Sequence, residues 1–565
     1  MSESRFRWTL AAIVLLAAIL RGLFPAADPP WRSTVGVVWH DEGAWTHNAR
    51  NKALYGAWVQ DEWNPVYIAP VFTGLEYASF AAFGVGLRQA RLVSQVAGLL
   101  SVLLLALGVR RIGGNTAGVF AGALLATNYV YVMYDRAAIM EALMAAFIVA
   151  SWYAVARAER QPWWGALAGV FATLAFFTKA AAAAYVGALG LLVIVEFIPP
   201  KGGSYANSVV SAFRRNFWIP AGLVISFGLI GAFFVLPHWS DYEFYNWQVS
   251  VTRKPSYDLH SLVDRVAWFP MLHDTFSRMW GALALGLFGA WATVLRWRRA
   301  GMAERLLLLW FDVGVLELLV HDVGNERRFV FLIPALVALT SLVLARGSLM
   351  DDEVRSVSRA RVLLAVPAIL YSAYVLWGPV IRVFYLQQVY AGVLRMPVRL
   401  SAAAAVLLTV VLVAAWPSVV RLLTARWTPR LAAGAVLLAV VWNMGQFGSW
   451  AIHRTYKNFQ TSIDLGRLLP PGTLVQGKLA NGLALENRIR PLFIGHGFGN
   501  YADRKDRWDV RYILTYTDPE IGREGNQIVD VLAAYPGWRI IMTLPVAETP
   551  SGHDTAALIE KRARN

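Results

Sequence analysis

Repeated apolar runs dominate the sequence, and each is about as long as a helix must be to cross the hydrocarbon core of a bilayer, roughly 20 residues. Two examples are TLAAIVLLAAILRGLF, residues 9–24, and LAAGAVLLAVVWNMGQF, residues 431–447. Only 16% of the 565 residues are charged, whereas about a quarter would be charged in a soluble domain. The sequence therefore predicts a polytopic α-helical membrane protein.

Basic residues form short clusters between these runs, at every second predicted loop. Because Arg and Lys concentrate in cytoplasmic loops, this spacing puts the N-terminus inside and predicts about 13 spans in the cytoplasmic (inner) membrane. The net charge of +16 is then a topology signal, so membrane lipid is an expected partner and nucleic acid is not. The clusters are Arg110–Arg111, Arg157 with Arg160, Lys201 with Arg214–Arg215, Arg296 with Arg298–Arg299 and Arg305, Arg346–Arg361, and Arg421–Arg430.

The chain is predicted to divide into a transmembrane domain, residues 1–450, and a C-terminal domain, residues 451–565. The transmembrane domain includes a long first outer loop, residues 25–86. The C-terminal domain has short alternating runs, GTLVQGKL, RPLFIGH, DVRYILTY and WRIIMTLPV, with one helical stretch, NQIVDVLAAY, before the last. Strands mixed with a helix predict a small α/β domain with its own core. An odd number of spans places this domain outside, on the same side as the first outer loop.

The densest polar cluster of the chain, VVWHDEGAWTHNARN at residues 37–51, lies in the first outer loop and contains Asp41 and Glu42. Ionisable residues are costly at membrane depth, so their placement at one side indicates an outward-facing site. The other ionisable residues predicted at the outer ends of spans are Asp135, Arg136, Glu141, Lys179, His321, Asp322, Glu326, Arg327 and Arg328.

This combination of charges indicates a reaction class. Arg and Lys can bind a phosphate that leaves with its negative charge, and a carboxylate can accept a proton from an attacking hydroxyl or amine. Such a site suits transfer of a group from a lipid phosphate, with Asp41 as the base and Arg136 and Lys179 as the phosphate clamp.

Several motifs then follow one another in a recognisable order. They are HDEG in the first outer loop, NPVY before an amphipathic stretch, GLRQARLVSQVAGLLSVLLLALGVRRIGG, YDRAAIMEALMAAF and FFTKA. In this order the chain resembles the GT-C superfamily of membrane glycosyltransferases, especially bacterial relatives of protein O-mannosyltransferases and of lipid A aminoarabinose transferases. The resemblance covers residues 8–195, and the rest by architecture alone. It implies an inverting hexosyl- or pentosyltransferase that moves a sugar from a polyprenyl-phosphate carrier to a protein, lipid or cell-envelope glycan outside the membrane.

The resemblance also implies roles for particular residues. It places the catalytic acidic motif on Asp41 and Glu42 and the donor phosphate on Arg136 and Lys179. Weaker candidates for the phosphate are Arg327 and Arg328, although Phe329 stands where the family usually has a tyrosine. Candidate substrate-binding residues are His40, Tyr67, Asp135, Glu141 and His321. Glu141 is also predicted to cap a helix or to pair with Arg136. A divalent cation is the one cofactor considered, and the absence of cysteine excludes thiolate metal sites and disulfides.

Two alternatives remain open. Asp312 and Glu317 fall near mid-depth of the ninth predicted span, where proton-coupled carriers use such residues, so the chain could be a transporter or flippase of an anionic or polyprenyl-linked lipid. It could also be a non-catalytic assembly subunit whose outer domain binds a partner. The one-sided placement of the polar groups favours the enzyme over both.

Overall fold

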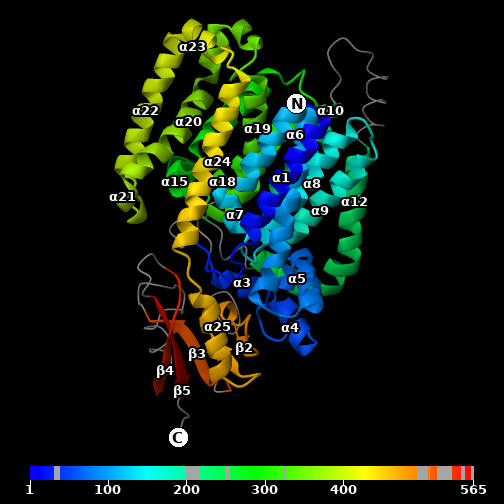
Figure 1. The fold of residues 1–565 in the computed structure, drawn as a ribbon, viewed down its shortest axis with the longest axis vertical. Coiled ribbons are helices and arrows are strands. Elements are labelled where there is room, and N and C mark those ends of the chain that lie inside the picture. The colour runs from blue at the N-terminus through cyan, green and yellow to red at the C-terminus, as the bar shows by residue number, and fades with distance from the viewer. Residues whose placement is uncertain are drawn as a thin grey trace.

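A computed structural model describes residues 1–30, 38–197, 217–248, 255–321, 326–492, 507, 509–517, 537–548 and 554–561. It is a bundle of long helices with a small α/β unit attached at one end (Figure 1). The N-terminus lies at the end of the bundle far from this unit. The predicted helix at residues 526–535 and the candidate residue Asp322 fall outside the described residues.

The described helices confirm a multi-pass membrane protein. Seven are long and apolar enough to cross a membrane, or eight if one bent pair counts as a single span. The seven are Leu87–Thr127, Met140–Ala158, Trp218–Trp247, Glu326–Arg346, Ala360–Phe384, Arg395–Ala414 and Pro429–Leu468. The bent pair is Leu259–Arg278 with Trp280–Leu295, whose axes differ by 113°.

The predicted number of about 13 spans is larger than this count, for physical reasons that differ among the helices. Helix α6 (Leu87–Thr127) has 41 residues, about 60 Å of helix and twice the hydrocarbon core. Gly114, with φ of 80°, breaks it into two segments. Helix α1 (Glu3–Gly22) carries one acidic and three basic residues, and α9 and α10 have 15 residues each.

The remaining bounds complete the bundle and its outer loop. The bundle also contains α7 (Tyr129–Asp135), α8 (Met140–Ala158), α9 (Trp164–Thr178), η2 (Ala180–Ala182), α10 (Ala183–Phe197), α12 (Trp218–Ile230), η3 (Gly231–Val235), η4 (Leu236–His238), α13 (Trp239–Glu243), η5 (Phe244–Gln248), α15 (Leu259–Leu272), α16 (Asp274–Arg278), α17 (Trp280–Leu295), α18 (Met302–His321), η6 (Glu326–Leu332), α19 (Ile333–Arg346), η7 (Asp352–Ser356), α20 (Arg359–Phe384), α21 (Leu386–Tyr390), α22 (Arg395–Ala414), α23 (Trp416–Leu423) and α24 (Pro429–Ile452). The first outer loop folds into α3 (His40–Trp45), α4 (His47–Tyr55), η1 (Pro65–Tyr67) and α5 (Pro70–Phe83).

Close helix packing holds the centre of the bundle. Helices α8 and α19 are its core, since 83% and 89% of their apolar windows are buried inside the protein. Small residues let neighbouring helices approach closely. This is common in membrane proteins, because in lipid the hydrophobic effect does not drive helices together and close packing has to hold them. A Cβ on Gly169 of α9 or on Gly222 of α12 would lie 2.4 Å or 2.1 Å from backbone atoms of the other helix. These two glycines therefore fix the distance between α9 and α12.

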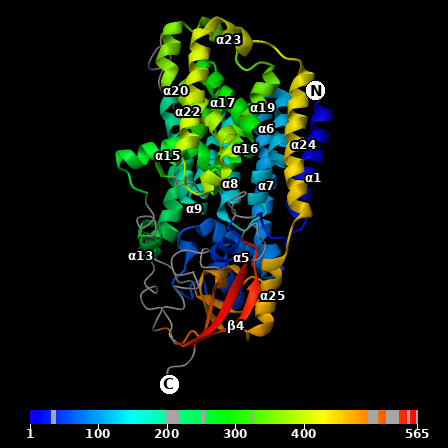
Figure 2. The ribbon, with the colours of Figure 1, turned by 90° about the vertical axis from the view of Figure 1, so that its left-hand side faces the viewer.

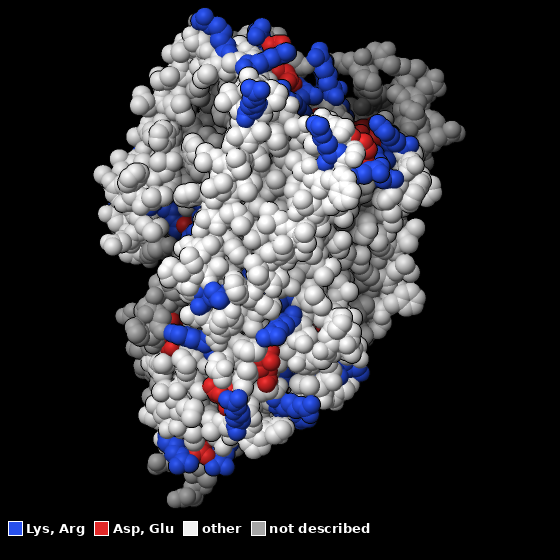
Figure 3. All heavy atoms as spheres, viewed as in Figure 1, with Lys and Arg blue, Asp and Glu red and all other residues white. Residues whose placement is uncertain are grey.

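Charge is distributed as a membrane requires. On the face in Figure 3 a largely uncharged belt separates Lys and Arg at the end near the N-terminus from a second charged region around the α/β unit. Turning the molecule by 90° shows α24 descending along one side of the bundle into α25 (Lys457–Leu468) and the sheet (Figure 2). One helical path therefore connects the bundle with the α/β unit.

The C-terminal unit contains a five-stranded mixed sheet, which confirms the predicted mixture of strands and helices. Strand order is β2-β1-β3-β5-β4, with β1 parallel to β2 and β3, and β5 antiparallel to β3 and β4. The strands and the additional helix are β1 (Leu474–Gln476), α26 (Lys478–Gly482), β2 (Arg490–Leu492), β3 (Tyr512–Tyr516), β4 (Trp538–Pro545) and β5 (Thr555–Lys561). Strand β5 was not predicted, although it lies between β3 and β4 and is almost wholly buried.

Candidate active site

Two carboxylates and two cations from four distant segments form a continuous chain of ion pairs. Arg327 Nη1 lies 2.6 Å from Asp41 Oδ2, and Arg327 Nε lies 3.6 Å from Glu141 Oε1. Lys179 Nζ donates to the same Glu141 oxygen at 2.5 Å. Side-chain exposure is 1% for Glu141 but 13%, 21% and 17% for Asp41, Arg327 and Lys179. The buried acid thus anchors two cations whose outer sides remain accessible.

Each of these side chains lies at or next to the end of a helix. Asp41 is in the first turn of α3, and Glu141 is in the first turn of α8, where the helix dipole favours a negative charge. Lys179 is the C-cap of α9, with extended backbone, and Arg327 is the second residue of η6. Glu141 therefore pairs with Lys179 and Arg327. It does not pair with Arg136, the partner predicted from the sequence.

Glu42 lies outside this chain of ion pairs and binds a partner that was not predicted from the sequence. Arg91 of α6 donates from Nε and Nη2 to the two Glu42 oxygens, both at 2.7 Å, and the Ala138 backbone N–H donates to Oε1 at 2.8 Å. The remaining Arg91 nitrogen donates to the carbonyls of Pro25 and Ala27. Glu42 and Arg91 are 3% exposed each, so this bidentate pair fixes α3 on α6.

Asp135 and Arg136 lie next to each other in sequence but contact other groups. Asp135 forms a buried ion pair with Arg21 of α1 at 2.6 Å. Arg136 donates to the carbonyls of Leu20 and Arg21 at 2.8 Å and 2.9 Å and lies over the ring of Trp450. These carbonyls lie at the C-terminal end of α1, where no further turn of the helix supplies N–H donors. The Arg136 guanidinium therefore satisfies them.

The other predicted site residues are arranged around this centre at different depths. His40 is buried, with Nε2 3.6 Å from Asp41 Oδ1 and Nδ1 3.4 Å from the Tyr516 hydroxyl. Tyr67 stacks on Tyr245, with ring centroids 5.7 Å apart, in an aromatic cluster of the outer loop. Arg328 donates to the carbonyl of His321 at 2.9 Å, and His321 Nδ1 lies 3.7 Å from Glu317.

The C-terminal unit packs directly on the acidic helix. A Cβ on Gly43 would lie 1.9 Å from the Asn481 carbonyl oxygen of α26, so only glycine lets the two helices meet. Trp39 donates from its indole to Glu548 at 2.6 Å, and the Tyr516 hydroxyl donates to the same carboxylate at 3.1 Å. Three elements of the C-terminal unit, α26, β3 and the segment after β4, therefore contact residues on both sides of Asp41.

Arg50 of α4 provides a second connection between the first outer loop and the C-terminal unit, and this connection was also not predicted. It is 1% exposed and donates to the carbonyls of Ala484, Asn487 and Ile489 at 2.9–3.0 Å. Burial lowers the pKa of Arg50 to about 10, because the charged form loses its hydration. A guanidinium with this pKa is still charged at neutral pH, so three carbonyls bind a full positive charge.

A metal ion has no evident set of ligands in the part of the chain that the structure describes. No group of three or more His, Asp or Glu residues is placed there to hold one. Asp41 and Glu42, which could have shared an ion, instead bind different arginines.

Comparison with known proteins bears on the fold. The model of the dolichyl-phosphate-mannose-protein mannosyltransferase family matches residues 69–201, which include Glu141 and Lys179 but neither Asp41 nor Arg327. The crystal structure of ArnT from Cupriavidus metallidurans bound to undecaprenyl phosphate aligns over 98% of this chain and 97% of its own, with a TM-score of 0.54 and 15% identity. The chain has the GT-C fold. The resemblance read from the motifs is confirmed.

Other comparisons add less to the GT-C assignment. ArnT without the ligand aligns over 99% of this chain and 98% of its own, with a TM-score of 0.53 and 16% identity. An Archaeoglobus fulgidus oligosaccharyltransferase in the apo form aligns over 91% of this chain and 70% of its own, with a TM-score of 0.45 and 13% identity. No curated protein matches the sequence.

Proposed function

We propose that this GT-C protein is an inverting glycosyltransferase. It moves a hexosyl or pentosyl group from a polyprenyl-phosphate carrier to an acceptor outside the cytoplasmic membrane, where the C-terminal domain, residues 451–565, also lies. The observation that carries the proposal is the ion-pair chain from Asp41 through Arg327 and Glu141 to Lys179. It combines a partly exposed carboxylate with two partly exposed cations, which are the groups that base catalysis and phosphate departure need.

The pairing suggests how the site is used. Arg327 binds Asp41 at 2.6 Å, so the proposed base and one of the proposed phosphate-binding cations are in direct contact. A donor phosphate can also accept two hydrogen bonds from a guanidinium. We expect the donor phosphate to bind Arg327 and Lys179, with the Arg327 guanidinium shifting from the Asp41 carboxylate toward the phosphate.

In the chemical step the base Asp41 takes a proton from the acceptor hydroxyl or amine. The acceptor oxygen or nitrogen forms a bond to the anomeric carbon as the bond from that carbon to the phosphate oxygen breaks. Lys179 and Arg327 stabilise the leaving phosphate, while Glu141 holds both cations in place. A single displacement of this kind inverts the anomeric configuration.

The other candidates take supporting roles in this proposal. Glu42, through Arg91, positions the helix that carries Asp41, and His40 orients the carboxylate or contacts the acceptor. Arg328 lies one residue beyond Arg327 and remains a candidate for the phosphate. Arg136 and Asp135 hold α1 and α7 together, so we assign them to the framework of the site and not to the donor phosphate.

The test is release of polyprenyl phosphate by purified protein in nanodiscs. A panel of labelled polyprenyl-phosphate sugars is offered with and without membrane extract as acceptor, to wild type, Asp41→Asn and Asp464→Asn. Asp464 is an exposed carboxylate paired with Arg467 on α25, so it controls for the loss of one charge. Release by wild type and Asp464→Asn, but not by Asp41→Asn, supports the proposal. Release by all three removes Asp41 as the base, and lipid movement across the bilayer without release supports a flippase.

A further inference from the structure

An elongated groove lies on the side of the bundle formed by α24, away from the ion-pair chain. Its volume is about 480 Å³, within the range of roughly 300–1,000 Å³ that is usual for ligand pockets. Apolar side chains of α6, α17, α19 and α24 form its walls, among them Leu124, Leu285, Val337, Leu438 and Trp442. Arg278 of α16 lines one end.

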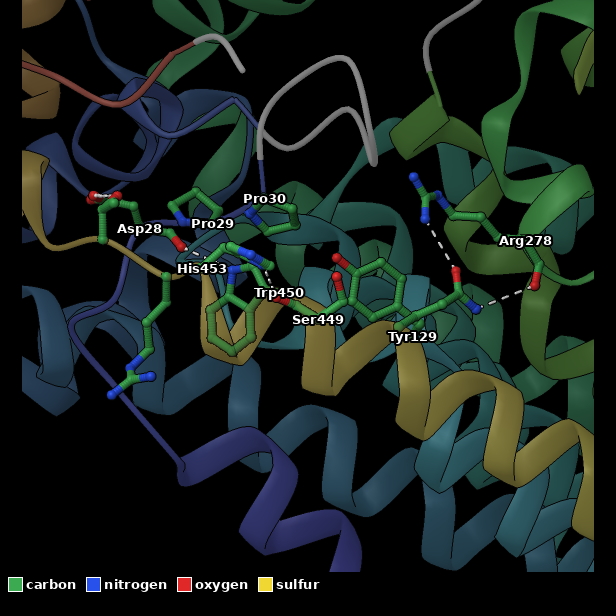
Figure 4. A pocket seen from close by; sticks show the side chains of 11 residues that line it. Asp28, Pro29, Pro30, Tyr129, Arg278, Ser449, Trp450 and His453 are labelled. Carbon is green, nitrogen blue, oxygen red and sulfur yellow. Dashed lines mark hydrogen bonds between the residues drawn. The ribbon is translucent and has the colours of Figure 1, made fainter. Parts of the chain in front are cut away.

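A second, polar hollow of about 260 Å³ continues from the same arginine. Arg278 lines both spaces, and the polar one is completed by Tyr129, Ser449, His453 and Arg454 (Figure 4). Asp28 also faces it, but the Thr455 hydroxyl and the backbone N–H groups of Lys457 and Asn458 donate to that carboxylate. The lining of the polar hollow therefore contains two arginines, Arg278 and Arg454, and one aspartate.

Helix α24 carries the transition from apolar to polar along one face. Ala435, Leu438 and Trp442 line the apolar groove, whereas Gln446, Ser449 and His453 line the polar hollow one to three turns further along. The apolar stretch is about 10 Å long at 1.5 Å per residue, which fits within one leaflet of a hydrocarbon core about 30 Å thick. The groove thus has room for the part of one lipid chain nearest the head group, with the head group at the outer end.

Local charge favours an anionic head group. Arg278 donates to Asp274 at 2.6 Å and to Gln446 at 3.1 Å, and its side chain is still 24% exposed. Asp274 is shared with Arg382, whose Nη1 lies 3.5 Å away. Arg278 and Arg382 both contact Asp274, so these three side chains together carry one positive charge beside the groove.

We propose that this groove binds an anionic glycerophospholipid of the bilayer. One acyl chain fills the apolar groove, and the phosphate accepts from Arg278. The site is distinct from the proposed donor site, since Lys179 follows α9 and the groove lies among α6, α16, α17, α19 and α24. In Figure 1, α24 and α9 lie on different sides of the bundle.

A lipid at this site would brace the segment next to the catalytic centre. The Thr275 backbone N–H and hydroxyl of α16 both donate to Glu326, and Glu326 immediately precedes Arg327. Phosphate binding at Arg278 would hold the end of α16 and thereby η6. Binding of the lipid itself does not depend on the proposed transferase activity.

The experiment measures lipid binding to the full chain, not turnover. Delipidated protein in detergent is titrated with dioleoyl phosphatidylglycerol or dioleoyl phosphatidylcholine, and native mass spectrometry and thermal unfolding report occupancy. Arg278→Gln removes the head-group contact, and Ala435→Phe fills the groove at an exposed position. The matched controls are Arg467→Gln, an exposed arginine of α25, and Ala433→Phe, an exposed alanine of α24 that does not line the groove.

We expect saturable binding of one phosphatidylglycerol, with apparent affinity weakened roughly tenfold or more in Arg278→Gln because a charged hydrogen bond is lost. Ala435→Phe should weaken it similarly, and neither control should. Equal binding of both lipids, or an unchanged affinity in Arg278→Gln and Ala435→Phe, would overturn the proposal. Displacement of phosphatidylglycerol by one undecaprenyl phosphate at lower concentration would also overturn it, since the groove would then be a polyprenyl site.

Discussion

The contact between the acidic helix and the C-terminal unit makes Gly43→Ala an informative change. The new Cβ would lie 1.9 Å from the Asn481 carbonyl oxygen, whereas ordinary contact begins at 3.4 Å. Backbone atoms cannot rotate away, so α3 and α26 must separate by about 1.5 Å. Overpacking of this kind costs about 1–3 kcal/mol. Asp41 lies two residues before Gly43, and a displacement of about 1 Å at a catalytic group can cost about 100-fold in rate.

The assay compares donor turnover and thermal unfolding for Gly43→Ala and Gly74→Ala. Gly74 is also a helical glycine of the first outer loop, but nothing lies within 4 Å of the position its Cβ would take. We expect Gly43→Ala to lose about 100-fold in turnover while Gly74→Ala stays near wild type and gains slightly in stability. Equal turnover in the two variants would refute the idea that the C-terminal unit positions Asp41.

Further changes test the roles assigned to single residues. Lys179→Met should lower turnover at least about 100-fold by removing one donor to the leaving phosphate, and activity retained in steady-state kinetics would remove this lysine from the site. Arg136→Met should lower the thermal unfolding temperature without changing the affinity for polyprenyl phosphate in a binding titration, whereas weakened binding would restore Arg136 as a phosphate ligand. Burial lowers the pKa of Lys561 from 10.5 to about 8, so between those pH values the unfolded chain binds more protons than the folded one and stability rises with pH. Lys561→Gln should flatten that rise in urea unfolding of the full chain, and an unchanged slope would contradict it.

Much of the architecture could be predicted because lipid restricts what the chain can do. The apolar runs had to become helices, since a helix satisfies its own backbone groups in hydrocarbon. The last predicted span, residues 431–447, corresponds to α24 at Pro429–Ile452. The count by length and composition, seven or eight, is lower than the predicted number of about 13 because Gly114 divides one long helical run into two segments and charged helices such as α1 also lie in the bundle.

The partners of individual charges could not be predicted from local sequence. Arg136 was a reasonable phosphate ligand by position, but the carbonyls that end α1 compete for it and are invisible in a sequence. Arg91 lay in a motif that carried the family resemblance, yet nothing in that motif distinguishes a partner of Glu42 from an interfacial anchor. The contact between Arg327 and Asp41 joins residues that are 286 positions apart, so nothing in the local sequence indicates it.

The position of Asp41 is therefore a property of the assembled protein. Helix α3 has six residues, too few to be stable alone, and its N-cap residue, Trp39, gives no side-chain cap. It is held on one side by Arg91 and Arg327 of the bundle and on the other by α26 and Glu548 of the C-terminal unit. Loss of either support would leave the acidic motif intact in sequence but without a fixed place. The C-terminal unit is thus better understood as one wall of the proposed active site than as an appended domain.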